Sequence, residues 1–479
     1  MADVPTPLYL ARQQVLGRVT DVLGSHGYVP IETPIIEPTE IFLRKSGGER
    51  VAQMYAFNYR DREIALRPEH TASILRMYVE SMQSEPLPIR LMYAGPVFRY
   101  EKPQAGRTRQ FTEVGCELLG AAGASADTEV IHLALEGLRV VDVPARLVLG
   151  HVGIVLDYLN RLPLRQRARD WLLWSMDRIR TGQPVDLEAD IAGLVGHSRL
   201  TGLLGEMGAG LHDLPADQLE QWFLAVLQEV GVQMQGQTRD AREIVAGVIA
   251  KMSRGGDEVA VRHAFDFIRE MATIRGAPAV VLPELRRIVE RYNLSPEPIE
   301  QIEDILNLLG AYGHLEEDIE LNPGLGRGLH YYTGMLFEIY AADRPTLQLC
   351  GGGRYDDLAY LLGARRAVPA CGFSYGLERL VEAARPVGEP PAVEALVVAA
   401  TPAATAAAIR VAEELRADGA CIELDVRGRS LSANRRDAER RGITQLVIVD
   451  TEGRVTTQQL GPAAPAETPG RTTSPVRNI

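Results

Sequence analysis

The stretch VFRYEKPQAGRTRQFTEVGCELLG, residues 97–120, decides the fold of the central part of this chain. Residues typical of strands lie on both sides of the polar turn PQAGR. This pattern predicts two strands, Tyr93–Tyr100 and Thr108–Leu119, joined as a hairpin.

Arginines on this hairpin and near a later glycine-rich segment could hold an anion. Planar guanidinium groups match phosphate oxygens, which they can bind through two donors at once. A helix is expected to begin near the later arginine, and the dipole of a helix N-terminus favours negative charge. The candidate cations are Arg99, Arg107, Arg109 and Arg379.

Acidic and phenolic side chains elsewhere could hold a cationic or polar ligand. Three glutamates, Glu69, Glu113 and Glu117, could surround an ammonium or an imidazole. The pair Tyr331 and Tyr332 offers hydroxyl donors and a stacking surface. Taken singly, each of these residues has an ordinary structural explanation as surface arginine or core tyrosine.

The order of the motifs is more specific than any motif alone. Besides the hairpin, the segments are GYVPIETPIIEPTEIF (27–42), LRPEHTA (66–72), GRGLHYYTGMLFEIY (326–340), LCGGGRYDDL (349–358) and CGFSYGLERL (371–380).

Length and composition predict two or three domains, because 479 residues exceed one ordinary core. Amphipathic patterns such as Ala216–Val230, Ala241–Met252 and Val259–Met271 predict a mostly helical block in the middle of the chain. Strands alternating with helices after a proline-rich linker, Arg385–Pro391, predict a small α/β domain. The expected divisions are a core of 1–155 with 316–385, a helical insertion of 156–315, an α/β domain of 392–460 and a disordered tail of 461–479.

The net charge of −12 does not favour indiscriminate binding to nucleic acid, although a local basic surface could still bind RNA. Such a strip is Arg427–Arg441, with six arginines against two acidic residues, and a solvated helix face is its alternative explanation. The four scattered cysteines form no C-x-x-C pair, which favours a reducing cytoplasm. No apolar run is long enough to predict a membrane span.

The motifs together resemble the histidyl-tRNA synthetase family. FRYEKPQAGRTRQF resembles motif 2 of class II synthetases, CGFSYGLERL resembles motif 3, and residues 27–42 resemble motif 1, the dimer interface. GRGLHYYTGMLFE and CGGGRYD resemble the two histidine-specific signatures, and IELDVRGRSLSANRRDAERRGITQLVIV resembles the anticodon-binding domain. The resemblance implies an α+β fold with a class II antiparallel-sheet catalytic core, a helical insertion and a C-terminal α/β anticodon-binding-like domain.

The resemblance also implies ligands and residue roles. ATP with Mg²⁺, histidine and tRNA(His) would be bound by a homodimer, with no metal held by protein side chains alone. Arg99 would bind the α-phosphate, Arg379 the γ-phosphate, Glu101 the adenine amino group, and Phe111 would stack on the adenine, with Arg107 and Arg109 nearby. Arg327 would stabilise charge at the α-phosphate and the histidine carboxylate, so Arg99, Arg327 and Arg379 would be catalytic.

On the amino-acid side, Glu69 and Thr71 would hold the α-ammonium of histidine. Glu117 and Tyr332 would read the imidazole nitrogens, with Tyr331 beside them. Glu113 stands where the synthetases usually have a glutamine that contacts the amino-acid end of histidine. A carboxylate there would attract an ammonium but repel a carboxylate.

Further departures from the family leave two functions open. His70 stands in place of a usual glycine and His330 in place of a usual aspartate, and LVLGHVGIV (147–155) resembles a paralogue, the regulatory subunit of ATP phosphoribosyltransferase. The first hypothesis is a histidine–tRNA ligase, favoured by the phosphate-facing arginines and the C-terminal domain. The alternative is a non-catalytic histidine sensor that binds the catalytic subunit of that phosphoribosyltransferase.

Overall fold

The computed structural model describes residues 3–43, 53–100, 108–195, 258–326, 331–386 and 392–460. The chain divides into two compact units, one of which contains Arg12–Pro386 and the other Val387–Ile479 together with Val4–Ala11. The predicted helices Ala216–Val230 and Ala241–Met252 and the predicted tail 461–479 lie outside the described residues. The domain boundaries inferred from the sequence stay a prediction.

The larger unit is built on an eight-stranded sheet with the order β1-β5-β6-β11-β10-β9-β7-β8. Its pairs are antiparallel except β1 with β5 and β7 with β8, which are parallel. This sheet confirms the predicted α+β class. The strands are β1 (Val29–Pro30), β5 (Ile89–Phe98), β6 (Gln110–Leu119), β7 (Ala145–His151), β8 (Ile319–Leu321), β9 (Met335–Ala341), β10 (Arg344–Arg354) and β11 (Ala370–Gly376).

The hairpin predicted from residues 97–120 is present as β5 and β6, in register from Ile89 opposite Leu119 to Phe98 opposite Gln110. The β-rich segment that precedes it is split between two sheets. Val29–Pro30 forms the edge strand β1, as its proline requires, because proline has no N–H to donate to a second neighbour. A separate three-stranded sheet joins β2 (Ile36–Pro38), β4 (Arg62–Leu66) and β3 (Ala56–Tyr59).

The glycine cluster at 351–353 lies inside strand β10. A Cβ atom on Gly352 would lie 2.5 Å from the carbonyl oxygen of Gly372 and 2.6 Å from the ring of Phe337. Glycine is therefore required here because neighbouring strands and side chains approach the backbone too closely for any other residue.

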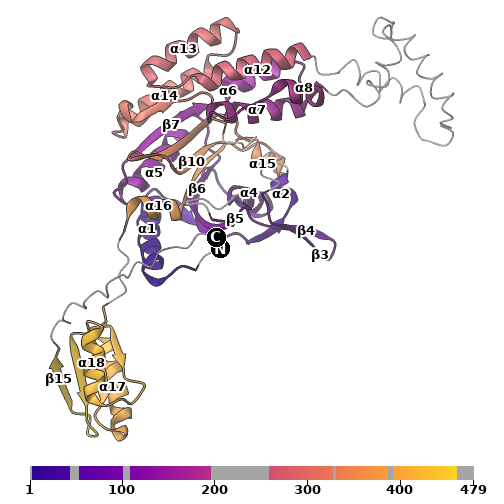
Figure 1. The fold of residues 1–479 in the computed structure, drawn as a ribbon. Coiled ribbons are helices and arrows are strands. Elements are labelled where there is room, and N and C mark those ends of the chain that lie inside the picture. Colours follow the sequence, from indigo (N-terminus) through magenta and orange to yellow (C-terminus); the bar gives the residue numbers. More distant parts are fainter. Residues whose placement is uncertain are drawn as a thin grey trace, which may run out of the picture. The chain divides into compact units, whose positions relative to one another are not determined.

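Helices cover the sheet, and several of them form a group beside β7 in Figure 1. Helix α12 contacts α6, α7 and α8, while α14 packs on α5 and β7, so the described part of the predicted helical block adjoins the core. The helices are α1 (Thr6–Ser25), α2 (Glu40–Leu43), α4 (Thr71–Met77) with a π-helical turn (Tyr78–Met82), α5 (Ala124–Arg139), α6 (Gly153–Arg161), α7 (Gln166–Arg180), α8 (Leu187–Val195), α12 (Glu258–Thr273), α13 (Pro278–Arg291), α14 (Glu297–Ala311), a 3₁₀ turn (Glu316–Asp318), α15 (Leu358–Leu361) and α16 (Leu377–Ala384). Among the helices in these ranges, none is both long and apolar enough to cross a membrane.

The smaller unit contains the α/β domain expected after the linker. Its sheet has the order β13-β12-β14-β15, with β15 antiparallel to β14 and the other pairs parallel. The predicted alternation of strands and helices is confirmed. The elements are β12 (Ala395–Ala399), a 3₁₀ turn (Pro402–Ala404), α17 (Thr405–Ala417), β13 (Ile422–Leu424), α18 (Leu431–Arg440), β14 (Gln445–Val449) and β15 (Val455–Gln459).

Candidate active site

A polar cavity lies where the central strands β5, β6, β10 and β11 meet the start of helix α4. It brings together six of the side chains singled out from the sequence. These are Glu69, Thr71, Arg99, Glu113, Tyr331 and Tyr332. Residues separated by more than 260 positions in the chain thus face one small space, which is the arrangement expected of a binding site.

The floor of the cavity depends on glycines that make room for Glu117. In the sheet register, Glu117 of β6 lies opposite Gly372 of β11, which in turn lies opposite Gly353 of β10. A Cβ atom on Gly372 would lie 2.1 Å from Oε2 of Glu117 and 2.5 Å from the hydroxyl oxygen of Tyr355. The glycine-rich strands therefore allow a buried carboxylate and a phenol to share the site.

Glu117 is held by two hydroxyl donors. The Thr71 hydroxyl donates to Oε1 of Glu117 at 2.7 Å, and the Tyr93 hydroxyl donates to the same atom at 3.4 Å. Burial, and then the nearby charge of Glu117, raises the pKa of Tyr93 well above its ordinary value, so this phenol stays protonated and can donate. The result is a fixed, buried acceptor suited to an N–H donor such as an imidazole.

Arg99 follows strand β5 and is held on both sides. Its Nε donates to the carbonyl oxygen of Pro68 at 2.8 Å, and its Nη2 donates to Oε1 of Glu113 at 2.7 Å. Its guanidinium carbon lies 4.9 Å from the centre of the Phe111 ring. Arg99 is thus a positioned cation between an aromatic face and a carboxylate, as expected of a residue that receives a phosphate.

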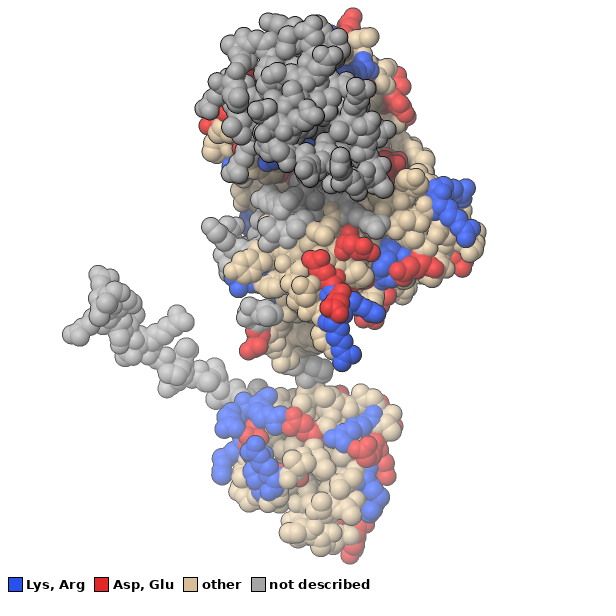
Figure 2. Space-filling model, turned by 90° about the vertical axis from the view of Figure 1, so that its right-hand side faces the viewer, with Lys and Arg blue, Asp and Glu red and all other residues tan. Residues whose placement is uncertain are grey.

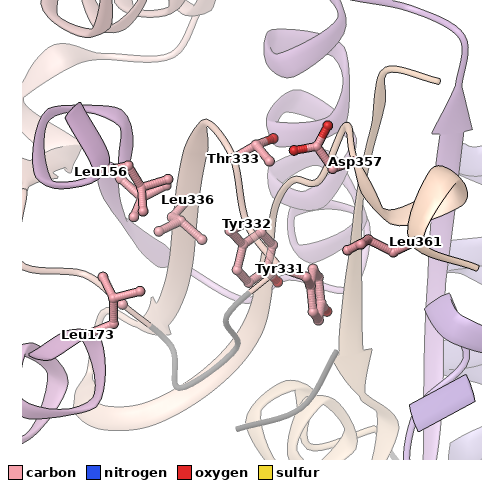
Figure 3. Close-up of a pocket in the computed structure, with 10 residues that line it drawn as sticks. Leu156, Leu173, Tyr331, Tyr332, Thr333, Leu336, Asp357 and Leu361 are labelled. Atoms are coloured by element: carbon pink, nitrogen blue, oxygen red, sulfur yellow. The ribbon is translucent and has the colours of Figure 1, made fainter. Parts of the chain in front are cut away.

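The tyrosine pair joins this cavity to a second, more apolar pocket. The Tyr331 hydroxyl donates to Oε2 of Glu69 at 3.4 Å, and the rings of Tyr331 and Tyr332 lie 4.7 Å apart. Figure 3 shows Tyr332 between Leu336 and Tyr331, with Leu361 beyond Tyr331. The pair therefore contributes both a polar edge to the first cavity and an apolar wall to the second.

Arg379 does not line the polar cavity but is tied into the sheet beside it. It lies in helix α16, and its Nη1 donates to the carbonyl oxygen of Gln348 in β10 at 3.0 Å. The Gln348 amide donates to Glu338 at 3.2 Å, and the Nη1 atom of Arg180 lies 3.6 Å from the same buried carboxylate. A polar chain thus connects α7 with Arg379, and we name these four residues, Arg180, Glu338, Gln348 and Arg379, the α7–Arg379 chain.

The remaining predicted residues fall into two groups. Arg109 lies at the start of β6, with its guanidinium carbon 4.4 Å from the Tyr100 ring, and like Phe111 it does not line the polar cavity. Four positions discussed from the sequence lie outside the described residues. They are Glu101, Arg107, Arg327 and His330.

The segment LVLGHVGIV, which resembled the regulatory paralogue, places its histidine away from the cavity. Nε2 of His151 lies 2.7 Å from the side-chain oxygen of Gln301 in α14, and the backbone N–H of Gly153 donates to its Nδ1 at 3.1 Å. Burial lowers the pKa of His151 to about 4, so the ring is neutral near pH 7. His151 therefore supports the packing of α14 on β7 and does not alter the amino-acid pocket.

Two tyrosines of the cavity were not singled out from the sequence. Tyr93 belongs to the hairpin strand β5, and Tyr355 follows the glycine cluster in the quoted motif GGGRYD. The Tyr355 ring contacts both Tyr331 and Tyr332, with centre-to-centre distances of 5.7 and 6.2 Å. The motif itself was the available signal, but only strand pairing shows that its tyrosine faces the site.

Possible metal ligands are scattered in the part of the chain that the structure describes. Within the described ranges, no group of three or more His, Cys, Asp or Glu side chains is placed to hold a metal ion. A divalent ion at this site would need oxygen ligands from another molecule, such as the phosphates of a nucleotide.

The antiparallel sheet and its pocket of fixed arginine, carboxylates and tyrosines define a class II synthetase-type catalytic core. The family model for Histidyl-tRNA synthetase matches residues 1–187 and 223–380, and that for the anticodon binding domain matches residues 394–459. The chain belongs to the histidyl-tRNA synthetase family. This result confirms the resemblance drawn from the motifs.

Individual relatives agree with this assignment. The chain is 32% identical over 459 residues to a Histidine–tRNA ligase of Picosynechococcus sp., covering 94% of this chain and 88% of that one. It is 29% identical over 455 residues to the Histidine–tRNA ligase of Methanocaldococcus jannaschii, covering 94% and 91%. These relatives favour the ligase hypothesis over the regulatory alternative.

Solved structures share the fold. An ATP phosphoribosyltransferase regulatory subunit/histidyl-tRNA synthetase from Bacillus halodurans superposes with a TM-score of 0.62 at 21% identity, covering 94% of this chain and 97% of that one. The apo histidyl-tRNA synthetase of S. aureus gives a TM-score of 0.58 at 22% identity, covering 96% of each chain. At these identities the likeness shows the fold alone.

The basic strip of the smaller unit is partly neutralised by its own neighbours. Arg429 donates to Asp437 at 3.1 Å and Arg435 to Glu439 at 2.9 Å, and Arg441 donates to Glu423. Figure 2 shows blue and red side chains interspersed on this unit. Its binding to RNA stays a prediction.

Proposed function

We infer that this chain is a histidine–tRNA ligase, which activates histidine with ATP and transfers it to tRNA(His). The observation that carries the inference is the polar cavity, in which a fixed arginine, Arg99, faces buried carboxylates and tyrosine hydroxyls. A cation suits the anionic reactants, and the carboxylates suit the ammonium and imidazole of histidine.

In the first step, a carboxylate oxygen of histidine attacks the α-phosphorus of ATP, and the bond from that phosphorus to the β-phosphate oxygen breaks. The products are histidyl-adenylate and pyrophosphate. Because two anions must approach each other, fixed positive charge lowers the barrier, and we assign that role to Arg99 and Arg379. Arg327, outside the described residues, is proposed as the third such cation.

We assign histidine recognition to the opposite side of the cavity. Glu69, which accepts from Tyr331, would bind the α-ammonium with the help of Thr71. Glu117 would accept from an imidazole N–H, and Tyr332 would contact the other ring nitrogen. An analogue without an N–H at this place would leave the buried acceptor unpaired, which costs free energy. This arrangement therefore favours histidine over residues of similar size.

We place adenine between the end of the hairpin and helix α16. Phe111 would stack on the adenine ring, and Arg109 would lie near it. Glu101 and Arg107, which are outside the described residues, are proposed to lie near the ring as well. Mg²⁺ would enter with the nucleotide, because this ion usually keeps several waters and takes few protein ligands. Its charge would offset that of the leaving pyrophosphate.

In the second step, a terminal ribose hydroxyl of the tRNA attacks the carbonyl carbon of histidyl-adenylate, and AMP leaves. The match to the anticodon binding domain supports a role for residues 394–459 in choosing the tRNA. A cytoplasmic location is proposed with this activity.

We also propose a homodimer formed through the segment that resembles motif 1. Several large apolar side chains of this segment and of the adjoining small sheet are at least 40% exposed in the single chain. They are Val29, Ile35, Ile36, Phe57 and Tyr59. Exposed apolar residues on β1 and on the two outer strands of the small sheet support an interface, which sedimentation equilibrium can test.

The deciding experiment measures exchange of labelled pyrophosphate into ATP. The purified chain is expected to support exchange only when histidine is present, and to charge tRNA(His). Arg327→Ala is expected to abolish exchange without unfolding the protein. If the unmodified chain bound histidine tightly but supported no exchange, the result would contradict the proposal and favour the alternative function of a histidine sensor.

A further inference from the structure

Two residues that depart from the family pattern, His70 and Glu113, touch each other inside the cavity. Nδ1 of His70 lies 3.3 Å from Oε2 of Glu113, and the two residues are only 2% and 5% exposed. They come from different elements, the turn before α4 and the strand β6. A contact between two buried, ionisable side chains requires that their charge be balanced.

The surroundings of His70 fix its ring on Glu113. The ring stacks on Tyr93, with centres 4.5 Å apart and planes 20° from parallel. Room for it comes from Gly95, since a Cβ atom there would lie 3.1 Å from Nε2 of His70 and 2.6 Å from Nη2 of Arg67. Gly95 lies directly opposite Glu113 in the β5–β6 hairpin, so the histidine sits over the strand position that pairs with the carboxylate.

Glu113 is therefore shared between two donors, one on each oxygen. Oε2 faces His70, and Oε1 accepts from Nη2 of Arg99 at 2.7 Å. Arg99 is also the cation assigned to the α-phosphate. A carboxylate held by Arg99 alone would compete with that phosphate for the same guanidinium.

Other charged groups lie near this pair, and the charges of Arg67 and Glu113 attract each other. The guanidinium of Arg67 donates to the backbone oxygens of Pro96 and Thr33, and Glu69 accepts from Tyr331. Glu117 is bound by Thr71. Among the contacts given for the described residues, His70 is the one at Oε2 of Glu113.

We propose that His70 is a positioning residue that anchors Glu113 through the contact at Oε2, so that the guanidinium of Arg99 is available to the anionic reactants. The proposal rests on the ligase function inferred above. It makes the two departures at positions 70 and 113 a compensating pair, which together substitute for the glycine and glutamine usual in the family.

The test compares variants in histidine-dependent pyrophosphate exchange, with kcat and KM measured separately for ATP and for histidine. His70→Asn keeps a donor near the position of Nδ1, whereas His70→Leu has similar volume and no donor. Each is made alone and combined with Glu113→Gln, which removes the charge that holds Arg99. Thermal unfolding and circular dichroism of every variant report on folding.

His70→Leu is expected to lower kcat/KM for ATP by about tenfold to a hundredfold, the range for losing a charge-assisted hydrogen bond. His70→Asn should stay within a few-fold of the unmodified protein. The double variant His70→Leu/Glu113→Gln should have a kcat/KM for ATP at least tenfold higher than His70→Leu alone, because Arg99 is then no longer held by a carboxylate.

The proposal assumes that the unmodified protein exchanges pyrophosphate. It would be overturned if His70→Asn and His70→Leu lost kcat/KM for ATP equally, or if Glu113→Gln gave no recovery. An unmodified protein with no exchange at all would instead overturn the ligase function, and this inference with it. A merely structural role for His70 would lower the unfolding temperature without the recovery by Glu113→Gln.

Discussion

Lowering the pH from 7 to 5 is expected to destabilise the larger unit through protonation of His151. The ring accepts from the backbone N–H of Gly153 at Nδ1, so Nε2 carries the proton and donates to Gln301. If Nδ1 were also protonated, its N–H would face the backbone N–H of Gly153, and neither donor would have an acceptor at this buried site. Burial is the main reason why the pKa of His151 is about 4 instead of the ordinary 6.5.

The sign and size of the effect follow from these two pKa values. The unfolded chain takes up a proton as the pH falls through 6.5, whereas the folded chain does so only near 4, so acid favours unfolding within this window. At 1.36 kcal/mol per tenfold change, the loss between pH 7 and pH 5 is about 2 kcal/mol. Well above pH 6.5 the contribution of His151 to the free energy of unfolding is complete and no longer changes with pH.

The assay is urea-induced unfolding followed by circular dichroism at pH 7 and pH 5. The control is His151→Asn, whose side-chain oxygen can still accept from Gly153 but which does not titrate. Other groups titrate in both proteins and cancel in the comparison. The unmodified protein should lose about 2 kcal/mol more than the variant over this interval. Equal losses in the two proteins would refute the assignment of a neutral, buried His151.

Three further predictions concern binding and catalysis. Glu117→Gln should raise the KM for histidine about tenfold to a hundredfold, since a bond to a charged acceptor contributes about 1.5–3 kcal/mol, and an unchanged KM would remove Glu117 from imidazole recognition. Glu338→Gln and Arg180→Met, which break the α7–Arg379 chain, should each raise the KM for ATP several-fold while the KM for histidine stays constant. The matched control is Arg178→Met, which lies on the same helix but is bonded to Pro184. Equal effects of the control and the other two variants would show that the chain does not position Arg379. Replacing Arg435 and Arg436 together by Gln should weaken tRNA binding and reduce the slope of log K against log salt by about 1.4–1.8, and an unchanged slope would leave the strip as solvated surface.

Much of the fold could be predicted because it is written in local patterns. The hairpin β5–β6 and the strand–helix alternation of the smaller unit follow from residue periodicity and turn residues, and both are present in the structure. The role of the glycines at 351–353 could not be predicted, because glycine favours turns locally but is also required wherever strands pack too closely for a side chain.

The candidate site was predictable only in part. The motifs named Arg99, Glu69 and Glu117, and the structure brings all three to one region of the sheet. Tyr355 was missed because its direction depends on strand register, which no local pattern gives. The substitution at 70 could be noticed in the sequence, but its partner could not be identified there.

The sequence by itself determined the family, the order of the motifs and the kinds of side chain available for catalysis, since these depend on residue identity and spacing. The tertiary structure alone decided which of those side chains meet. His70 and Glu113 are 43 positions apart, and the hydrogen bond between them exists because α4 begins over the β5–β6 hairpin. Hydrogen bonding and charge balance act over a few ångströms, so their effect on Arg99 depends on packing, which local sequence does not specify.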